Sequence, residues 1–133
     1  AQGAWTGSIW LTVAESDTRP WVVENLLAAS WTDTVRSRAM TGKPARQLRT
    51  AWTEAWESSE GPGPLPMPLQ GIIYAESAHR FTRAQNKALS GSPVGQIVGN
   101  MNAVRSTRDV VFDIVEEWIA VTEAQAARLH DAS

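Results

Sequence analysis

The chain has 133 residues, of which 43% are hydrophobic and 20% are charged, as in one ordinary globular domain. Its 12 basic residues are interspersed with 14 acidic ones, and cysteine is absent, which excludes disulfides, thiolate chemistry and a basic nucleic-acid footprint. We find no apolar run of membrane-spanning length and no cationic leader, and therefore expect a cytoplasmic protein with neither a nucleic-acid nor a membrane partner.

The first half of the chain predicts a short strand followed by two helices. Residues 4–6 suit a buried strand that ends in a turn at Gly7 and Ser8, and Pro20 suits the first turn of a helix that runs to about residue 30. Residues 33–38 read as extended. Pro44 favours the start of a helix that runs to about residue 58, with an apolar face of Ala45, Leu48, Trp52, Ala55 and Trp56, and with Arg46 and Arg49 off that face.

The second half predicts a connector and two longer helices. Residues 60–70 contain four prolines and two glycines and cannot form a regular element. A helix should follow over about residues 69–89, and a loop of small and amide residues over 90–102. Ser106 and Asp109 form an approximate capping box before the last helix. The apolar stripe of that helix contains Val111, Val115, Trp118, Thr122 and Leu129, with Ile114 and Ile119 alongside.

The residue types alone indicate no reaction. His79 and His130 each stand without a second metal ligand at suitable spacing, and no motif for a nucleophilic serine or a phosphate loop is present. Glu116 and Glu117 diverge by about 100° on a helix and cannot act as a pair. Composition and spacing by themselves indicate a mostly helical module.

Four segments in the same order resemble the C-terminal part of the nitronate monooxygenase (2-nitropropane dioxygenase-like) family. They are A-x-G-x-x-x-G-S-x-x-L-x-x-x-E-S at residues 1–16, DTVRSRAMTGKPAR at 33–46, LPMPLQ at 65–70 and GQIVGNMNAVR at 95–105. Ile9, Trp10 and Lys43 depart from the family pattern, as do Trp21 and Val22, so we expect the substrate-side surface to differ.

The resemblance implies an α/β parent: an FMN-binding (β/α)8 TIM barrel with an inserted helical subdomain. This chain, mostly α itself, would carry the last barrel strand and phosphate-binding loop in residues 1–16, the helical subdomain in 17–102 and the C-terminal barrel-packing helix in 103–133. A complete barrel needs about 250 residues, so we expect a C-terminal fragment or one product of a split gene, with the N-terminal part of the barrel as its partner.

The resemblance also implies the site residues. Gly7 and Ser8 would bind the FMN phosphate, because barrels commonly hold a phosphate in the loops after the last strands; the alternative is a strand-ending turn without a ligand. Gly95, Gln96 and Gly99 would lie near the substrate or cofactor, or form a tight structural turn. The catalytic histidine of the family lies upstream, so no catalytic residue and no metal ligand is expected here, and the fragment alone should be inactive.

Three functions remain open at this stage. The first is an FMN-dependent oxidoreductase that oxidises alkyl nitronates with oxygen. The second is an FMN-dependent reductase or dehydrogenase of the same fold that acts on an acyl-thioester of the CoA type, since seven tryptophans could line a site for a larger, apolar small-molecule substrate. The third is a non-catalytic helical interaction module. Assembly into a homo-oligomer is compatible with each.

Overall fold

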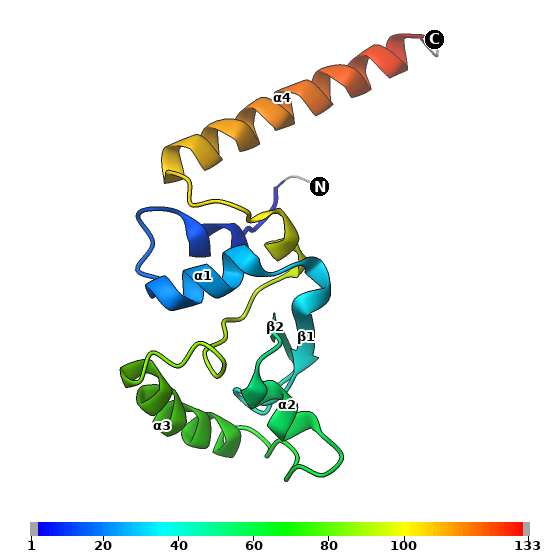
Figure 1. Ribbon diagram of the computed structural model, residues 1–133. Helices are drawn as coiled ribbons and strands as arrows, with labels where there is room; N and C mark the ends of the chain where they lie inside the picture. Colours follow the sequence, from blue (N-terminus) through cyan, green and yellow to red (C-terminus); the bar gives the residue numbers. More distant parts are fainter. Residues whose placement is uncertain (1–2, 132–133) are drawn as a thin grey trace.

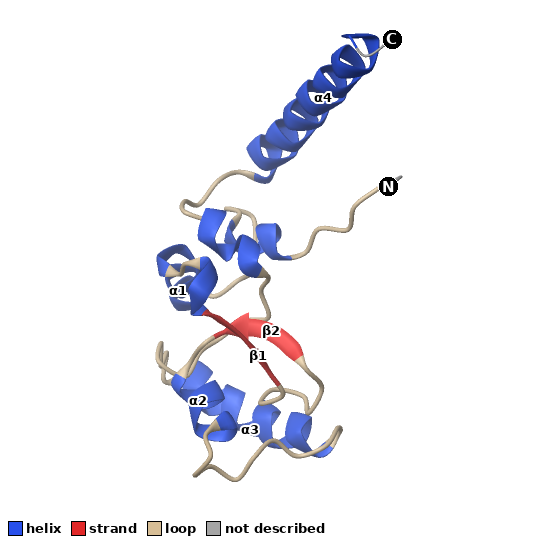
Figure 2. Ribbon diagram, turned by 90° about the vertical axis from the view of Figure 1, so that its right-hand side faces the viewer, coloured by secondary structure: helices blue, strands red, loops and turns tan. Residues whose placement is uncertain are grey.

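The computed structural model describes residues 3–131, and this part of the chain is mostly helical with a two-stranded sheet (Figure 2). In Figure 1, helix α1 and the short 3-10 helices lie above the sheet, α2 and α3 lie below it, and α4 projects as an arm. The elements are η1 (Ser8–Thr12), α1 (Pro20–Ala28), η2 (Trp31–Asp33), β1 (Thr34–Ser37), β2 (Ala45–Leu48), α2 (Ala51–Glu57), α3 (Leu69–Arg83), η3 (Gln96–Asn100) and α4 (Thr107–Asp131).

The core beneath α1 is built from segments that are distant in sequence. Leu26 of α1 and Val98 of η3 are fully buried and belong to one apolar cluster. The other buried members of the cluster are Val22, Leu48, Val94 and Met101. Burial of such side chains is worth about 1.5–3 kcal/mol each, so this cluster holds α1, β2 and η3 together.

The sheet corrects the prediction of a helix that starts at Pro44. β1 and β2 pair in antiparallel register, with Thr34 opposite Leu48 and Arg36 opposite Arg46. The outer edge of β2 is also paired, because the Leu48 N–H donates to Ser92 O and the Val94 N–H donates to Arg46 O, both at 3.1 Å. Hydrogen bonds on both edges outweigh the helical spacing of the apolar residues, and residues 45–48 form a strand.

Of the two helices below the sheet, α2 begins at a side-chain cap and α3 ends earlier than predicted. Thr50 caps α2 by accepting a hydrogen bond from the Thr53 N–H at 3.3 Å, so α2 starts at Ala51, seven residues after the proline where a helix was expected to begin. α3 starts at Leu69, as predicted, but stops at Arg83 because Gln85 adopts a left-handed φ of 49°. Ile72 on α3 is 64% exposed.

Two of the sequence motifs pack against each other. Gly42 has a φ of +83°, and a Cβ there would lie 2.6 Å from the carbonyl oxygen of Leu65, so the turn before β2 requires glycine. Gln70 is completely buried; its Nε2 donates to Ala39 O at 2.7 Å and its Oε1 accepts from the Leu65 N–H at 3.0 Å. The segments 33–46 and 65–70 therefore form one structural unit.

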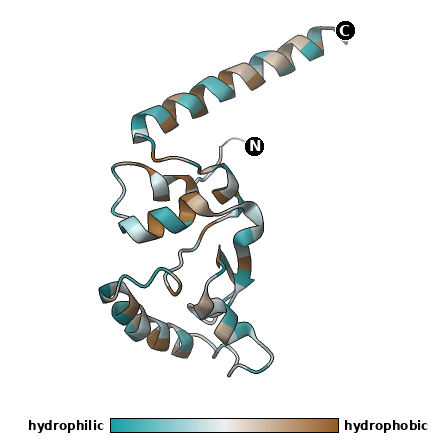
Figure 3. Ribbon diagram, in the orientation of Figure 1, coloured by the Kyte–Doolittle hydropathy of each residue, from teal (hydrophilic) through white to brown (hydrophobic). Residues whose placement is uncertain are grey.

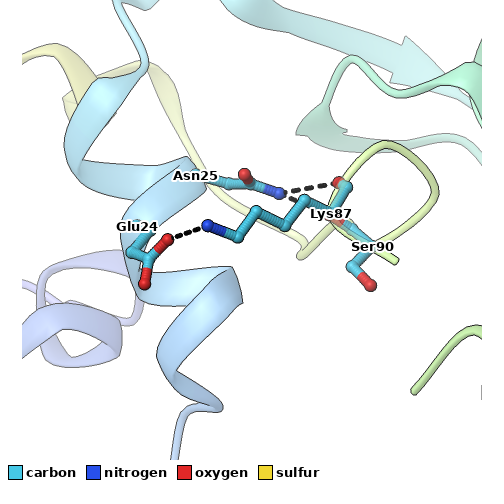
Figure 4. Close-up of polar contacts among 4 residues, drawn as sticks. All are labelled: Glu24, Asn25, Lys87 and Ser90. Atoms are coloured by element: carbon cyan, nitrogen blue, oxygen red, sulfur yellow. Dashed lines mark hydrogen bonds and ion pairs between the residues drawn. The ribbon is translucent and has the colours of Figure 1, made fainter. Parts of the chain in front are cut away.

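A polar contact joins α1 to the loop that follows α3 (Figure 4). The Asn25 side-chain amide donates to Lys87 O at 2.9 Å and to Ser90 O at 3.1 Å, and the Lys87 ammonium pairs with Glu24. This contact places the segment 90–95 beneath α1, where it runs along β2.

The start of α4 is capped from two sides. Ser106 Oγ accepts the Asp109 N–H at 3.1 Å, which confirms the predicted N-cap. The carboxylate of Glu15 accepts both the backbone N–H and the hydroxyl of Thr107, each at 2.8 Å. Val13 forms a parallel bridge with Arg105 just before these contacts. The first turn of α4 is thus bonded to the beginning of the chain.

The apolar stripe of α4 is exposed along its length. Trp118, for example, is 67% exposed. Figure 3 shows hydrophobic and hydrophilic residues interspersed along this projecting helix. The predicted strand at residues 4–6 does not form in this chain: the segment has no regular structure and Trp5 is fully exposed. No strand among residues 3–131 lies beside it, and a strand without a pairing partner is not stable.

Candidate functional site

Three of the residues predicted from the sequence meet in one shallow hollow. Gly7, Ser8 and Gly95 line it, together with Leu11, Arg46 and residues 92–94, and its volume is about 500 Å³. We call it the Ser8 hollow. It joins the segment at the start of η1, the outer edge of β2 and the segment before η3, so residues that are distant in the sequence contribute to it.

A hydrogen bond between the two turns fixes the hydroxyl of Ser8. The Gly95 N–H donates to Ser8 Oγ at 2.9 Å, although 87 residues separate them in the sequence. A hydroxyl group that accepts one hydrogen bond keeps its own proton for donation. Ser8 can therefore donate to an acceptor in the hollow without giving up its contact with Gly95.

Gly7 leaves its backbone uncovered. A Cβ built at Gly7 meets no atom within 4 Å, and its φ of −120° is accessible to any residue. Neither backbone strain nor packing among the described residues accounts for glycine here. The missing side chain instead leaves room for an external group to approach the main chain closely.

Arg46 also lines the hollow, and sequence reasoning missed it. Its side chain extends from β2, where one guanidinium N–H donates to Thr34 Oγ1 at 3.0 Å. Within residues 3–131, Arg46 forms no ion pair with a carboxylate. The expectation of a helix over residues 44–58 placed Arg46 off the apolar face and gave it no role; Gly42, which marks the turn of a hairpin, was the available signal for a strand.

Gln96 and Gly99 lie outside the Ser8 hollow. Gln96 is exposed at the first position of η3, directly after Gly95. Gly99 packs against η2: a Cβ there would lie 3.1 Å from the Trp31 backbone nitrogen. Close packing between η2 and η3 is thus sufficient to account for glycine at position 99.

An apolar hollow adjoins the Ser8 hollow. It has a volume of about 390 Å³ and shares Gly7 and Ser8 with its neighbour. Its remaining lining residues are Trp5, Thr6, Ile9, Ile97 and Ile114. Gly7 and Ser8 therefore lie between a recess that Arg46 lines and an apolar one, an arrangement that suits a ligand with an anionic end and an apolar body.

Another hollow, between α1 and the loop after α3, is less suited to an anion. It contains Arg49 and Lys87, but the Lys87 ammonium already pairs with Glu24. Asp33 also lines it, and hydrogen bonds from the backbone and side chain of Ser30 lower the pKa of Asp33, so this carboxyl group stays negatively charged. The opposite charges compensate each other here, whereas no acidic residue of the described chain lines the Ser8 hollow.

The two histidines stand apart from these hollows. His79 is exposed on α3, and His130 is exposed in the last turn of α4. Across residues 3–131 we find no group of three histidine or acidic side chains that could hold a metal ion. None of the helices in this described part is long and apolar enough to cross a membrane.

Comparison with known proteins identifies a relative of this chain. The chain is 48% identical over 125 residues to a protein of Mycobacterium tuberculosis named "Putative monooxygenase Rv1533". The match covers 90% of this chain and 33% of the relative, so the chain spans about a third of that protein's length. No protein family matches the chain, and neither does any solved structure.

Proposed function

We propose that this chain forms the C-terminal part of an FMN-dependent oxidoreductase that resembles nitronate monooxygenase, with Gly7 and Ser8 at the FMN phosphate. The observation that carries the proposal is the Ser8 hollow, where an uncovered glycine backbone and a free hydroxyl proton lie together. The similarity to a protein named as a monooxygenase supports the general class.

The residues of the hollow fit a phosphate group. Phosphate oxygens accept hydrogen bonds, and Ser8 together with the backbone near Gly7 offers donors to them. When bound, FMN would supply the redox chemistry by taking electrons from the substrate and passing them to oxygen. The role of this chain is to bind and orient the cofactor, and the base that acts on the substrate would come from the preceding sequence.

Alkyl nitronates are the first substrate class that we propose, on the family resemblance. The apolar hollow beside Gly7 and Ser8 supports a second candidate, an acyl-thioester of the CoA type, because Trp5, Ile9 and Ile97 can pack against an apolar chain. Assays with both substrate classes under air and under anaerobic conditions separate the two. A nitronate oxidase consumes oxygen, whereas a thioester reductase or dehydrogenase works with another electron donor or acceptor.

The exposed apolar surface supports a larger parent protein. Trp5, Trp118 and Phe112 are solvent-exposed in this chain, and an apolar stripe of this length is usually an interface. We propose that preceding barrel sequence covers α4 and pairs with residues 4–6. A longer parent protein is consistent with the length of the relative, since this chain spans only about a third of it.

Substitutions of Gly7 and Ser8 in the complete gene product test the proposal. Ser8→Ala removes one hydrogen bond to a charged group and should weaken FMN binding roughly 10- to 100-fold. Gly7→Val should weaken it further, since a branched side chain would occupy the space left for the phosphate. Gly71→Val is the matched control, because a Cβ at Gly71 also meets no atom within 4 Å but lies on α3, away from the hollow.

The measurements are flavin content after purification and the dissociation constant of FMN, with circular dichroism to verify folding. Wild-type affinity in folded Gly7→Val and Ser8→Ala variants would show that the phosphate lies elsewhere. A complete protein that binds no flavin would refute the oxidoreductase and favour the helical interaction module.

A further inference from the structure

We propose that Arg46 is the cationic residue that makes the Ser8 hollow selective for a phosphate monoester. This inference rests on the proposed function, which places a phosphate near Gly7 and Ser8, and it adds the residue that determines the charge of the ligand. The resemblance and the relative assign no role to this arginine.

The fold holds Arg46 at the wall of the hollow. β2 lies between β1 and the segment 92–94, and the carbonyl oxygen of Arg46 accepts the Val94 N–H at 3.1 Å. Gly95, the residue that follows Val94, then donates to Ser8 Oγ at 2.9 Å. These contacts tie the backbone of Arg46 to Gly95, whose N–H donates to the hydroxyl that would bind the phosphate.

A buried hydroxyl orients the guanidinium group. Thr34 is buried on β1, and its own hydroxyl proton is donated to Trp31 O at 3.1 Å, so its oxygen is an acceptor for Arg46. This bond uses one of the five N–H donors of the arginine. The remaining donors are available to a ligand, and the fixed end of the side chain reduces the rotamer entropy that binding would cost.

No carboxylate of the described chain compensates the charge of Arg46. The lining residues of the described chain include no carboxylate, and Arg46 has no ion-pair partner within residues 3–131. A neutral hydroxyl group would leave this charge unpaired, whereas a phosphate monoester carries the opposite charge and matches the planar fork of donors. The chemistry therefore selects a phosphorylated ligand over its unphosphorylated form.

The test compares FMN with riboflavin, which has the same ring system without the phosphate. Dissociation constants are measured by flavin fluorescence on the complete protein after removal of its flavin. Arg46→Gln should weaken FMN binding roughly 10- to 100-fold and leave riboflavin binding unchanged, because only FMN presents the anion. Arg46→Lys should restore part of the preference, since it keeps the charge without the fork.

Arg36→Gln is the matched control. Arg36 is the exposed cross-strand partner of Arg46 on β1 and does not line the hollow, so its loss changes the net charge equally but should not change the ratio of FMN to riboflavin affinity. Inorganic phosphate is the third probe. Competition with FMN at millimolar phosphate in the wild type, and its loss in Arg46→Gln, would show that the site recognises the phosphate itself.

The outcomes separate this inference from the proposed function. A wild type that prefers FMN to riboflavin, with an Arg46→Gln variant that folds and keeps the same preference, refutes the role of Arg46 and leaves the flavin site intact. A wild type that binds no flavin refutes both. If Arg46→Gln has a lower melting temperature through loss of the Thr34 contact, the ratio of the two dissociation constants still decides, because misfolding weakens both flavins alike.

Discussion

Replacement of Gln70 by leucine should weaken the contact between the hairpin turn and the proline-rich connector. Gln70 is fully buried and forms two hydrogen bonds, one to Ala39 O and one from the Leu65 N–H. Loss of the two bonds affects their backbone partners differently. Ala39 O also accepts the Trp52 indole N–H at 2.9 Å and stays paired in the variant, whereas the Leu65 N–H loses its acceptor.

The magnitude follows from that single orphaned donor. A buried polar group without a partner costs about 1–3 kcal/mol, and leucine itself brings no polar atom that needs one. We therefore expect Gln70→Leu to lower the free energy of unfolding by about 1–3 kcal/mol, about half of what a count of two lost bonds with two orphaned groups would give.

Urea unfolding followed by circular dichroism measures this change. Gln125→Leu is the control, because Gln125 is exposed on α4 and its substitution should change the free energy of unfolding by less than about 0.5 kcal/mol. A Gln70→Leu variant as stable as the control would show that the connector does not depend on this side chain.

Three further substitutions test other contacts. Hydrogen bonds from the backbone and hydroxyl of Thr107 lower the pKa of Glu15. The stabilisation from this contact is therefore present above the ordinary glutamate pKa and is lost as the pH falls through the lowered value. Glu15→Gln should reduce the melting temperature at neutral pH but not in acid, and an equal loss at both pH values would contradict this assignment. Gly99→Ala should cost about 1–3 kcal/mol in urea unfolding, because its Cβ would crowd the Trp31 backbone, and unchanged stability would show that η2 and η3 adjust freely. Gln96→Ala in the complete protein should alter turnover or substrate affinity and leave the melting temperature almost unchanged; normal kinetics with a large loss of stability would give Gln96 a structural role.

Elements that begin with local chemistry were predictable from the sequence. Pro20 occupies the first position of α1, and Ser106 caps α4 by accepting the Asp109 N–H. Both signals act within one helical turn, so they need no knowledge of the rest of the fold. The start of α3 at Leu69, after the proline-rich connector, followed for the same reason.

The strand β1 falls within the predicted extended segment 33–38, but the strand at residues 45–48 was not predicted. Residues 45–48 carry apolar side chains at helical spacing, but β1 and the segment 92–94 bond to both of their edges. The end of α3 was missed as well, because the left-handed residue that ends it is Gln85 and not the glycine that usually occupies such a position. Gly42 was a local signal for the strand, but its pairing partners lie elsewhere in the sequence. The backbone angle that ends α3 has no signature in the local sequence.

The sequence predicted only part of the candidate site. The resemblance indicated Gly7, Ser8 and Gly95, and the structure brings these three into one hollow. Arg46 was overlooked because the expected helix over residues 44–58 placed it off the apolar face and gave it no partner. Their joint binding of a ligand stays a prediction until the flavin experiments are done.

The paired segments at Val13 and Arg105 affect the order in which the chain can fold. Closing a loop of the 92 residues that separate Glu15 from Thr107 costs roughly 4 kcal/mol of chain entropy when the intervening chain is unfolded. Once α1, the sheet and η3 are packed, the two ends of that loop are already neighbours and most of this cost has been met (Figure 1). The Glu15 cap should therefore form late in folding, and it should also open first, exposing the first turn of α4 to hydrogen exchange before the rest of the body unfolds.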